Sequence, residues 1–504
     1  MSESRTSNSL RNITFNIGNQ LLNLLLAFIS RSVFLSVLNV EYLGISGLFG
    51  DIFAMLCLAD LGIGSAMTYS MYKPLAEHDY DRLAGLITLY RRIYLTIAAA
   101  ITCLGFALIP FLKYLVNLDT DMPQLELYYI LGLLNCVSSY LVVYKTSILH
   151  ADQKGYLISK YSGLFNILKT VFTTVFLLIT RSYILHLIIQ VAFTYFTNLF
   201  NSHIAVKHYP FIQNRVKLAK GEASKIFSNI KSVFLYKLSS VLITATDNTL
   251  ISVMVNTASV GYYSNYMVAV TKVYNIVNTV FYSLTASLGN LIVKENEKRR
   301  YEIFQIMQSV SLILSTFCVA CVFCLEEDFI RIWIGSEYLL DKTVLWAIVT
   351  NFYFSIILMP IWVFREATGL YQKTKYVMLS TAAVNLITSV VLGRVMGLAG
   401  ILFATSIARL ATYFWYEPVL LFKNYFGKSS LIYFGGVLKS LLTTLAIVLT
   451  VSYCMNTIHI TSWLGLLLKA CAVGITSLLL VILIYHRSEG LQLVLRRAKS
   501  MIHK

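Results

Sequence analysis

The segment TLYRRIYLTIAAAITCLGFALIPFLKYLV, residues 88–116, is apolar over most of its length. A helix of about 20 apolar residues is long enough to cross a hydrocarbon core of roughly 30 Å. Runs of this kind recur along the chain, for example at 162–180, 374–393 and 460–485. Only 13% of the 504 residues are charged, whereas soluble domains carry about 25%. The sequence therefore predicts an all-α integral membrane protein that crosses the bilayer many times.

About fourteen transmembrane helices are expected when the chain is divided at its charged and Gly/Pro-rich loops. Their predicted limits are 12–38, 43–69, 88–116, 124–149, 161–180, 183–206, 229–255, 259–293, 302–325, 339–364, 374–393, 398–422, 430–455 and 460–485. The polar segment before the first helix lacks a cleavage site, so we expect it to be retained. The eight cysteines all lie in apolar runs. We interpret them as small packing residues and predict no metal site and no disulfide framework.

The net charge of +17 is distributed unevenly between the two sides of the membrane. With the N-terminus inside, the inner loops and tails hold about 29 of the 41 Lys and Arg residues, and the outer loops about five. Cytoplasmic loops of membrane proteins carry such an excess. The distribution predicts that both termini face the cytoplasm, and it explains the basic composition without a nucleic-acid partner.

Matching features at a nearly constant offset indicate an internal duplication. A shift of 217 residues aligns Gly44 with Gly261, and a shift of 219 aligns Asn166 with Asn385. Six helices per copy give both copies the same orientation, as in parallel repeats related by an axis along the membrane normal. We predict an N-terminal lobe at 1–206, a basic cytoplasmic linker at 207–228, a second six-helix lobe at 229–428, and two extra helices with a basic tail at 429–504.

Polar side chains form stripes on three of the predicted helices. The first helix carries Asn12, Asn16, Asn19, Asn23 and Ser30/Arg31 on one stripe, at steps of three and four residues with Ala27 bridging the last gap. The helix at 229–255 repeats this spacing, and the helix at 259–293 carries Lys272 and Asn275. Single residues of this kind are explained by hydrogen bonds between helices. For three aligned stripes we favour a water-filled cavity between the lobes.

Basic residues lie at bilayer depth, among them Arg31, Lys237, Lys272 and Arg409. Arginine at the bilayer centre costs about 2.5–3.5 kcal/mol on insertion scales, and a cavity that holds an anion removes this cost. Arg31 could instead extend to the outer headgroups, since it lies about 12 Å from its helix end. Acids at depth are fewer: Asp51, Asp60 and Asp247. The predicted cavity is therefore cationic and suited to a negatively charged ligand.

The segment RSVFLSVLNVEYLGISGLFGDIFAMLCLADLGIGSAMTYSMYKPLAEHD, residues 31–79, resembles the N-terminal signature of the Wzx-like polysaccharide flippases. These belong to the superfamily that also contains the multidrug MATE exporters and the lipid II flippase. Arg31, Tyr42-Leu43-Gly44, Gly47-Leu48-Phe49 and Leu61-Gly62-Ile63-Gly64 carry the resemblance. It implies a MATE-like fold of two six-helix lobes and two further helices, and it extends along the whole chain.

The resemblance also implies a function. Such a protein moves an undecaprenyl-diphosphate-linked oligosaccharide from the inner to the outer leaflet of the bacterial cytoplasmic membrane, for O-antigen, capsule or exopolysaccharide assembly. A polysaccharide polymerase and a chain-length regulator are the implied protein partners. Arg31 matches the position expected to meet the diphosphate. Lys272, Arg409 and Lys237, with Asn23 and Asn275, are the other predicted substrate-binding residues. Na⁺ or H⁺ coupling through Asp60 or Asp247 is an option, although Asp247 could equally neutralise Arg31; no other cofactor is expected.

Two other functions compete with this interpretation. A cation-coupled drug exporter on the same fold would need an essential acid, whereas the only charge within the first predicted span is Arg31. A membrane enzyme such as a polysaccharide polymerase would need a long outer loop with catalytic residues. The segment LEEDFIRIWIGSEYLLDK, residues 325–342, is the only candidate and is short. We therefore predict a transporter and not an enzyme.

Overall fold

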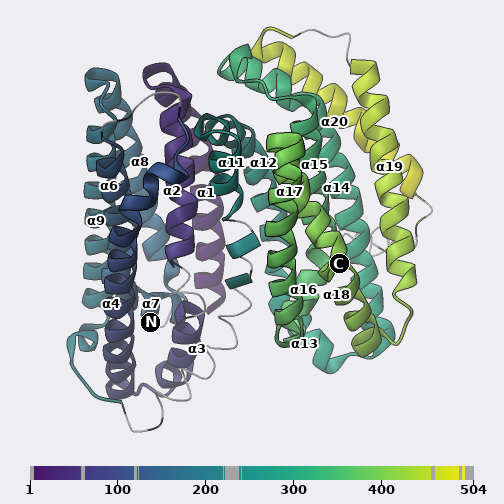
Figure 1. Ribbon diagram of the computed structural model, residues 1–504. Helices are drawn as coiled ribbons and strands as arrows, with labels where there is room; N and C mark the ends of the chain where they lie inside the picture. The colour runs from purple at the N-terminus through teal and green to yellow at the C-terminus, as the bar shows by residue number, and fades with distance from the viewer. Residues whose placement is uncertain are drawn as a thin grey trace. The chain divides into compact units, whose positions relative to one another are not determined.

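The computed structural model of the chain describes residues 5–57, 63–118, 122, 124–218, 221, 238–239, 241–243, 245–455, 460–486, 488 and 491–493. Regular structure in these residues is helical, with no β-strand. Contacts divide the chain into two units, Met1–Gly261 and Tyr262–Lys504 (Figure 1). Each unit is described by itself below.

Seven helices in the described ranges are long and apolar enough to cross a membrane, or up to nine if each of two bent helix pairs is one span. The bent pairs are Leu125–Leu141 with Val143–Ala151, at 50°, and Lys342–Ile357 with Met359–Thr368, at 41°. The predicted all-α, multi-pass membrane fold is thus confirmed. The total of fourteen helices stays a prediction.

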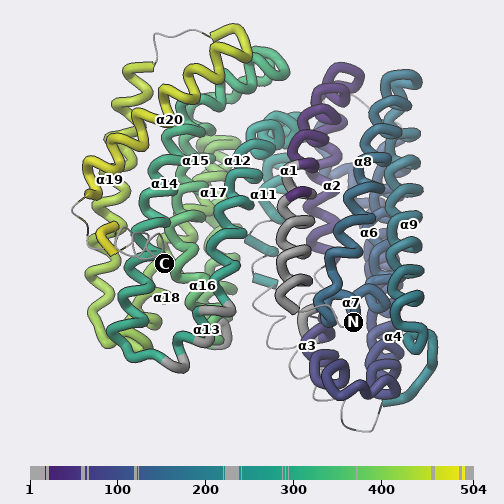
Figure 2. The backbone as a smooth tube through the Cα atoms, turned by 180° about the vertical axis from the view of Figure 1, so that it is seen from behind, coloured from purple at the N-terminus to yellow at the C-terminus, as the bar shows by residue number. Residues whose placement is uncertain are grey.

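The first unit is built from helices, and short turns join several of them, for example at 38–39 and 181–182 (Figure 2). Asn39, Asp79 and Ser182 begin three of them, because their side-chain oxygens accept hydrogen bonds from backbone N–H groups of the first turn. The helices of this unit are α1 (Arg5–Val37), α2 (Val40–Leu56), α3 (Ile63–Ala76), α4 (Tyr80–Leu108), α5 (Leu112–Leu115), α6 (Leu125–Ser138), α7 (Val143–Ala151), α8 (Gly155–Thr180), α9 (Tyr183–His208) and α11 (Asp247–Met254). The first turn of α12 (Thr257–Ser283) also belongs to it.

An aromatic cluster fixes the packing of α1, α2, α6 and α9. The ring of Tyr183 lies 5.8 Å from Phe34, 5.0 Å from Tyr42 and 4.9 Å from Tyr128, in edge-to-face arrangements that aromatic rings prefer. Phe34 and Tyr183 are buried, and so is Tyr128. Three parts of the sequence, at residues 34–42, 128 and 183, are therefore held at one point.

Two glycines allow α2 to cross the start of α12 at backbone contact. A Cβ atom on Gly44 would lie 2.0 Å from the carbonyl oxygen of Thr257, and one on Gly261 would lie 2.4 Å from that of Val40. Gly44 and Gly261 are the residues that the internal repeat aligns. The absence of a side chain at Gly44 thus permits close helix packing. Gly50, further along α2, has open space around it.

The second unit is organised around α14 (Glu297–Trp333), which packs against α15, α19 and α20 (Figures 1 and 2). An aromatic core forms where α14, α16 and the segment Phe422–Phe426 meet: Phe304 lies 5.6 Å from Phe364 and 5.4 Å from Phe422, ring centre to ring centre. The other helices are α13 (Thr285–Lys294), α15 (Lys342–Ile357), α16 (Met359–Thr368), α17 (Tyr371–Ala411), α18 (Tyr413–Leu421), α19 (Leu431–Met455) and α20 (Trp463–Tyr485).

Helix α17 reverses direction at Gly397, whose φ of 57° and ψ of −133° are not helical. The Asn385 amide donates to the Thr405 hydroxyl at 3.1 Å, and the Thr381 and Thr412 hydroxyls lie 2.6 Å apart. Twenty residues of straight helix would separate Asn385 from Thr405 by about 30 Å, so the two arms must be antiparallel. This reversal coincides with the predicted break between the helices at 374–393 and 398–422.

An ion-pair network joins α20 to α14. The Lys469 ammonium lies 2.6 Å from Asp328 Oδ2, and the Arg331 guanidinium lies 2.8 Å from Asp328 Oδ1. Lys469 and Asp328 have only 8% and 10% of their side chains exposed. Asp328 lies in the segment 325–342, the one place considered for enzyme chemistry. Its carboxylate there binds Lys469 of α20, a helix that follows the two predicted repeats.

Candidate functional site

Arg409 is held at the junction of α15 and α17 by neutral groups. Its guanidinium donates to the Ser355 hydroxyl at 2.8 Å and to the Asn351 carbonyl oxygen at 3.3 Å. Asn351 is itself fixed, since its amide donates to the Leu402 carbonyl oxygen at 2.7 Å and it accepts a hydrogen bond from Ser406. The polar network therefore orients the guanidinium without neutralising its charge.

Arg409 has capacity for a further acceptor. Its Nε is buried and has no hydrogen-bond partner within the described residues. The side chain is half-buried and makes no ion pair with a carboxylate in the part of the chain that the structure describes. Tyr274 of α12 and Tyr413 of α18 lie within electrostatic range of it. A partly buried cation with neutral neighbours is the electrostatic requirement for binding an anion.

Arg365, on α16, is a contrasting case in the same unit. Its guanidinium donates to Glu417 Oε1 of α18 at 2.7 Å and lies 3.5 Å from Glu366. The Arg365 and Glu417 side chains are 5% and 2% exposed. The charge of Arg365 is thus neutralised inside the protein, and this pair is a structural contact between two helices.

Lys272 and Asn275 lie one turn apart on α12. Lys272 is half-buried and forms no hydrogen bond or ion pair with any residue that the structure describes. Asn275 is exposed, and its carbonyl oxygen accepts a hydrogen bond from the Thr279 hydroxyl at 2.8 Å. Both side chains remain available to a ligand.

Arg31 and Asn23 lie on α1, which packs against α8. Arg31 is half-buried, three residues before Phe34 of the aromatic cluster. The side-chain oxygen Oδ1 of Asn23 accepts a hydrogen bond from the side-chain amide of Asn166 on α8. Asn23 therefore joins two helices, which is the role expected of an isolated polar residue, and its amide nitrogen is the group left for a substrate.

Of the acids considered for ion coupling, Asp247 is half-buried at the start of α11. Its neighbour Asn248 donates a backbone N–H to Asp51 Oδ2 of α2 at 3.3 Å. Asp60 and Lys237 lie outside the described residues. No group of three His, Cys, Asp or Glu side chains among the described residues is placed to hold a metal ion.

The structure brings together groups that the sequence did not single out. Ser406 donates to Asn351. Asn351 and Ser355 accept from Arg409, and their spacing of four on one apolar helix was the available signal. Their contact with Arg409 spans more than 50 residues and depends on tertiary packing. Convergence of Arg31, Lys272 and Arg409 on one chamber stays a prediction.

The fold is shared with solved transporters. The lipid II flippase MurJ in an inward closed conformation is 16% identical, with 95% of this chain and 99% of that chain covered and a TM-score of 0.67. An inward-facing multidrug resistance MATE transporter of the MOP superfamily is 12% identical, with 79% of this chain and 93% of that chain covered and a TM-score of 0.58. An MOP superfamily transporter from Pyrococcus furiosus is 12% identical, with 84% of this chain and 97% of that chain covered and a TM-score of 0.55. Its binding pocket is described as having reverse polarity.

These likenesses define the class: the chain has the fold of the MOP superfamily, whose solved members named above are transporters and a flippase. Residues 84–341 match the family described as polysaccharide biosynthesis protein, and the chain belongs to that family. No curated protein sequence matches the chain significantly. The predicted resemblance to the Wzx-like flippases is confirmed by the family match and the shared fold. The fold shared with solved transporters agrees with the predicted assignment to transporters and not enzymes.

Proposed function

We propose that this protein is a flippase for undecaprenyl-diphosphate-linked oligosaccharides in a bacterial cytoplasmic membrane. It moves each unit from the inner to the outer leaflet by alternating access, with both termini cytoplasmic. The family's link to polysaccharide biosynthesis supports a glycan substrate, and the fold shared with the lipid II flippase supports a lipid-linked one. The product would enter O-antigen, capsule or exopolysaccharide assembly, where a polymerase and a chain-length regulator act next.

The observation that carries the proposal is Arg409. It lies in a membrane-spanning segment, and all its hydrogen-bond acceptors among the described residues are neutral. A diphosphate carries at least one negative charge per phosphate, and the guanidinium group binds it through paired N–H donors. A few such contacts suffice, because tighter binding would slow release into the outer leaflet.

The other predicted residues complete this proposal. Arg31 contributes from the first lobe and Lys272 and Lys237 from the second, while Asn23 and Asn275 hydrogen-bond to sugar hydroxyls. The polyprenyl chain remains in the lipid between helices. Asp247 or Asp60 would couple the cycle to Na⁺ or H⁺ by changing its charge.

Replacing Arg31 tests the proposal. In a strain that lacks its own flippase, the wild-type protein should restore surface polysaccharide. We expect Arg31→Ala to abolish that restoration and Arg31→Lys to keep part of it, because lysine retains the charge but not the bidentate geometry. Immunoblots of membranes show whether each variant is as abundant as the wild type. With the Ala variant, lipid-linked oligosaccharide units should accumulate on the cytoplasmic side of the membrane. Normal polysaccharide in the Ala variant would refute the site.

A cation-coupled drug exporter is the second candidate, and the fold shared with MATE transporters favours it. It requires an essential acid and tolerates the loss of Arg31. If Asp247→Asn abolishes resistance to organic cations while Arg31→Ala preserves it, the exporter replaces the flippase as the better assignment.

A further inference from the structure

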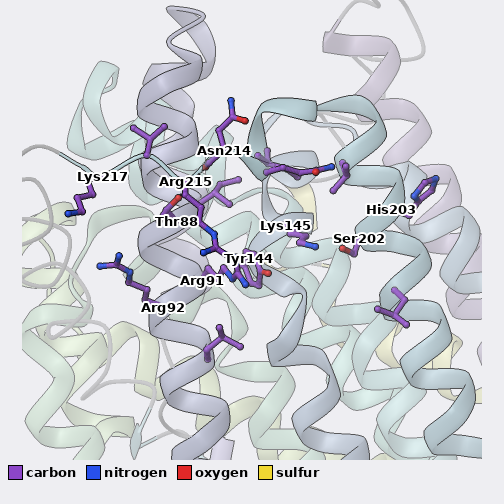
Figure 3. Close-up of a pocket in the computed structure, with 17 residues that line it drawn as sticks. Thr88, Arg91, Arg92, Tyr144, Lys145, Ser202, His203, Asn214, Arg215 and Lys217 are labelled. Carbon is purple, nitrogen blue, oxygen red and sulfur yellow. Dashed lines mark hydrogen bonds between the residues drawn. The ribbon is translucent and has the colours of Figure 1, made fainter.

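The first unit contains a basic cavity that the proposed function does not use (Figure 3). Its volume is about 800 Å³, within the range of small-molecule sites. It lies between α4, α7, α9 and the segment 212–217. Arg91, Arg92, Lys145, Arg215, Lys217 and His203 line it, and no Asp or Glu does.

The charges in this cavity are uncompensated. Arg91, Lys145 and Arg215, like the other two cations, form no ion pair with a carboxylate in the described part of the chain. Arg91 and Lys145 are half-buried and lie within electrostatic range of each other. Like charges repel more strongly where water is partly excluded. Such an arrangement is stabilised by a bound anion.

Three helices place the cavity at the edge of the hydrocarbon core. After Arg92 of α4, the chain has no charged residue until Lys113 of α5, which is about the length needed to cross the bilayer. Residues 127–144, directly before Lys145, include no Lys, Arg, Asp or Glu. Helix α9 includes none up to Ser202. Arg91 and Arg92 of α4 precede an apolar stretch, whereas Lys145 of α7 and His203 of α9 follow one, so the three helices bring basic residues to one headgroup level.

The segment that carries Arg215 and Lys217 is anchored over the cavity. The Thr88 hydroxyl of α4 donates to the Asn214 carbonyl oxygen at 3.4 Å, and a Cβ on Gly85 would lie 3.3 Å from Leu218. Before it, the Tyr209 hydroxyl donates to Asp152, and Lys154 lies 2.7 Å from the same carboxylate. Burial, followed by the Asp152 contact, raises the pKa of Tyr209 and keeps this donor protonated.

We infer that this cavity binds the negatively charged phosphate groups of lipids, at the membrane side that the charge distribution predicts to be cytoplasmic. Basic pockets between transmembrane helices bind such headgroups. The inference goes beyond the proposed function, since it holds whether the lipid is a polyprenyl diphosphate or an anionic phospholipid.

The test measures binding to the purified full-length protein in neutral detergent. The probes are farnesyl diphosphate, phosphatidylglycerol, phosphatidylcholine and inorganic pyrophosphate. We expect an anionic lipid to bind, and Arg91→Gln combined with Lys145→Gln to weaken binding at least about tenfold, which corresponds to about 1.4 kcal/mol. Lys207→Gln is the matched control, because Lys207 is exposed on α9 near His203 but does not line the cavity; it should bind as the wild type does.

The outcomes separate the possible ligands. Stronger binding of farnesyl diphosphate than of phosphatidylglycerol supports a loading site for the transported lipid, and equal binding supports a phospholipid site. Unchanged binding by the double variant overturns the inference, as does binding of pyrophosphate without any contribution from lipid. If the double variant does not fold, Arg215→Gln with Lys217→Gln, both exposed, replaces it. Failure here leaves the Arg31 complementation result unaffected, so the two proposals fail separately.

Discussion

Arg365 and Glu417 form an ion pair between α16 and α18 that water barely reaches, with side chains 5% and 2% exposed. Without Glu417, the buried Arg365 keeps only the more distant and more exposed Glu366 carboxylate, 3.5 Å away. Loss of one partner of a buried pair costs up to about 3–5 kcal/mol. We therefore expect Glu417→Leu to lower the unfolding temperature strongly. Thermal unfolding of purified variants in detergent measures this effect.

A double variant distinguishes charge from packing. Arg365→Met combined with Glu417→Leu removes both charges and keeps similar volumes, so most of the lost stability should return. If the double variant is as unstable as the sum of the two single variants, the ion pair is not the reason for the instability.

Arg409 should behave in the opposite way, because no carboxylate depends on it among the described residues. Replacing it by Leu removes a half-buried charge that costs free energy to keep in the membrane. We expect Arg409→Leu to fold at least as stably as the wild type and to lose polysaccharide transport. Unfolding temperature and complementation, measured on the same variant, check this; retained transport would exclude Arg409 from the substrate site.

At the scale of elements, the crossing of α2 and α12 depends on the absence of a side chain. Gly44→Ala would put a methyl group 2.0 Å from the Thr257 carbonyl oxygen. Neither backbone can yield without moving a helix, so we expect a loss of at least about 1–3 kcal/mol. Size-exclusion profiles and unfolding temperatures in detergent should show it.

Gly50→Ala is the control for that crossing. It lies on the same helix, and nothing lies within 4 Å of its added methyl group. Alanine favours the helix over glycine by about 1 kcal/mol, so this variant should be neutral or more stable. Equal effects at Gly44 and Gly50 would mean that α2 and α12 do not cross at backbone contact.

For the whole molecule, features that depend on local pattern were predictable from the sequence. The apolar runs gave the helical class, and the reversal at Gly397 falls where the span limits predicted it. The setting of Arg409 was not predictable, because Asn351 and Ser355 reach it only through the packing of α15 on α17. The basic cavity was missed for a similar reason: Arg91, Lys145 and Arg215 served only as topology markers until the fold brought them together.

The orientation of the two units in the membrane can be tested through their matching turns. Arg181, with φ 51°, lies between α8 and α9, and Arg394 lies just before the reversal in α17. Parallel repeats place both turns on the outer side, whereas inverted repeats would place them on opposite sides. The positive-inside rule predicts the outer side for both. Lys207 and Lys298, which are also exposed, are predicted to be inside.

Single cysteines at these four positions, reacted with a membrane-impermeant maleimide, measure the orientation. We expect Arg181→Cys and Arg394→Cys to be labelled in intact cells, and Lys207→Cys and Lys298→Cys only after the membrane is opened. The wild-type protein is the background control, because its eight cysteines lie in apolar runs. Labelling of Arg181→Cys and Arg394→Cys from opposite sides would rule out the parallel repeat.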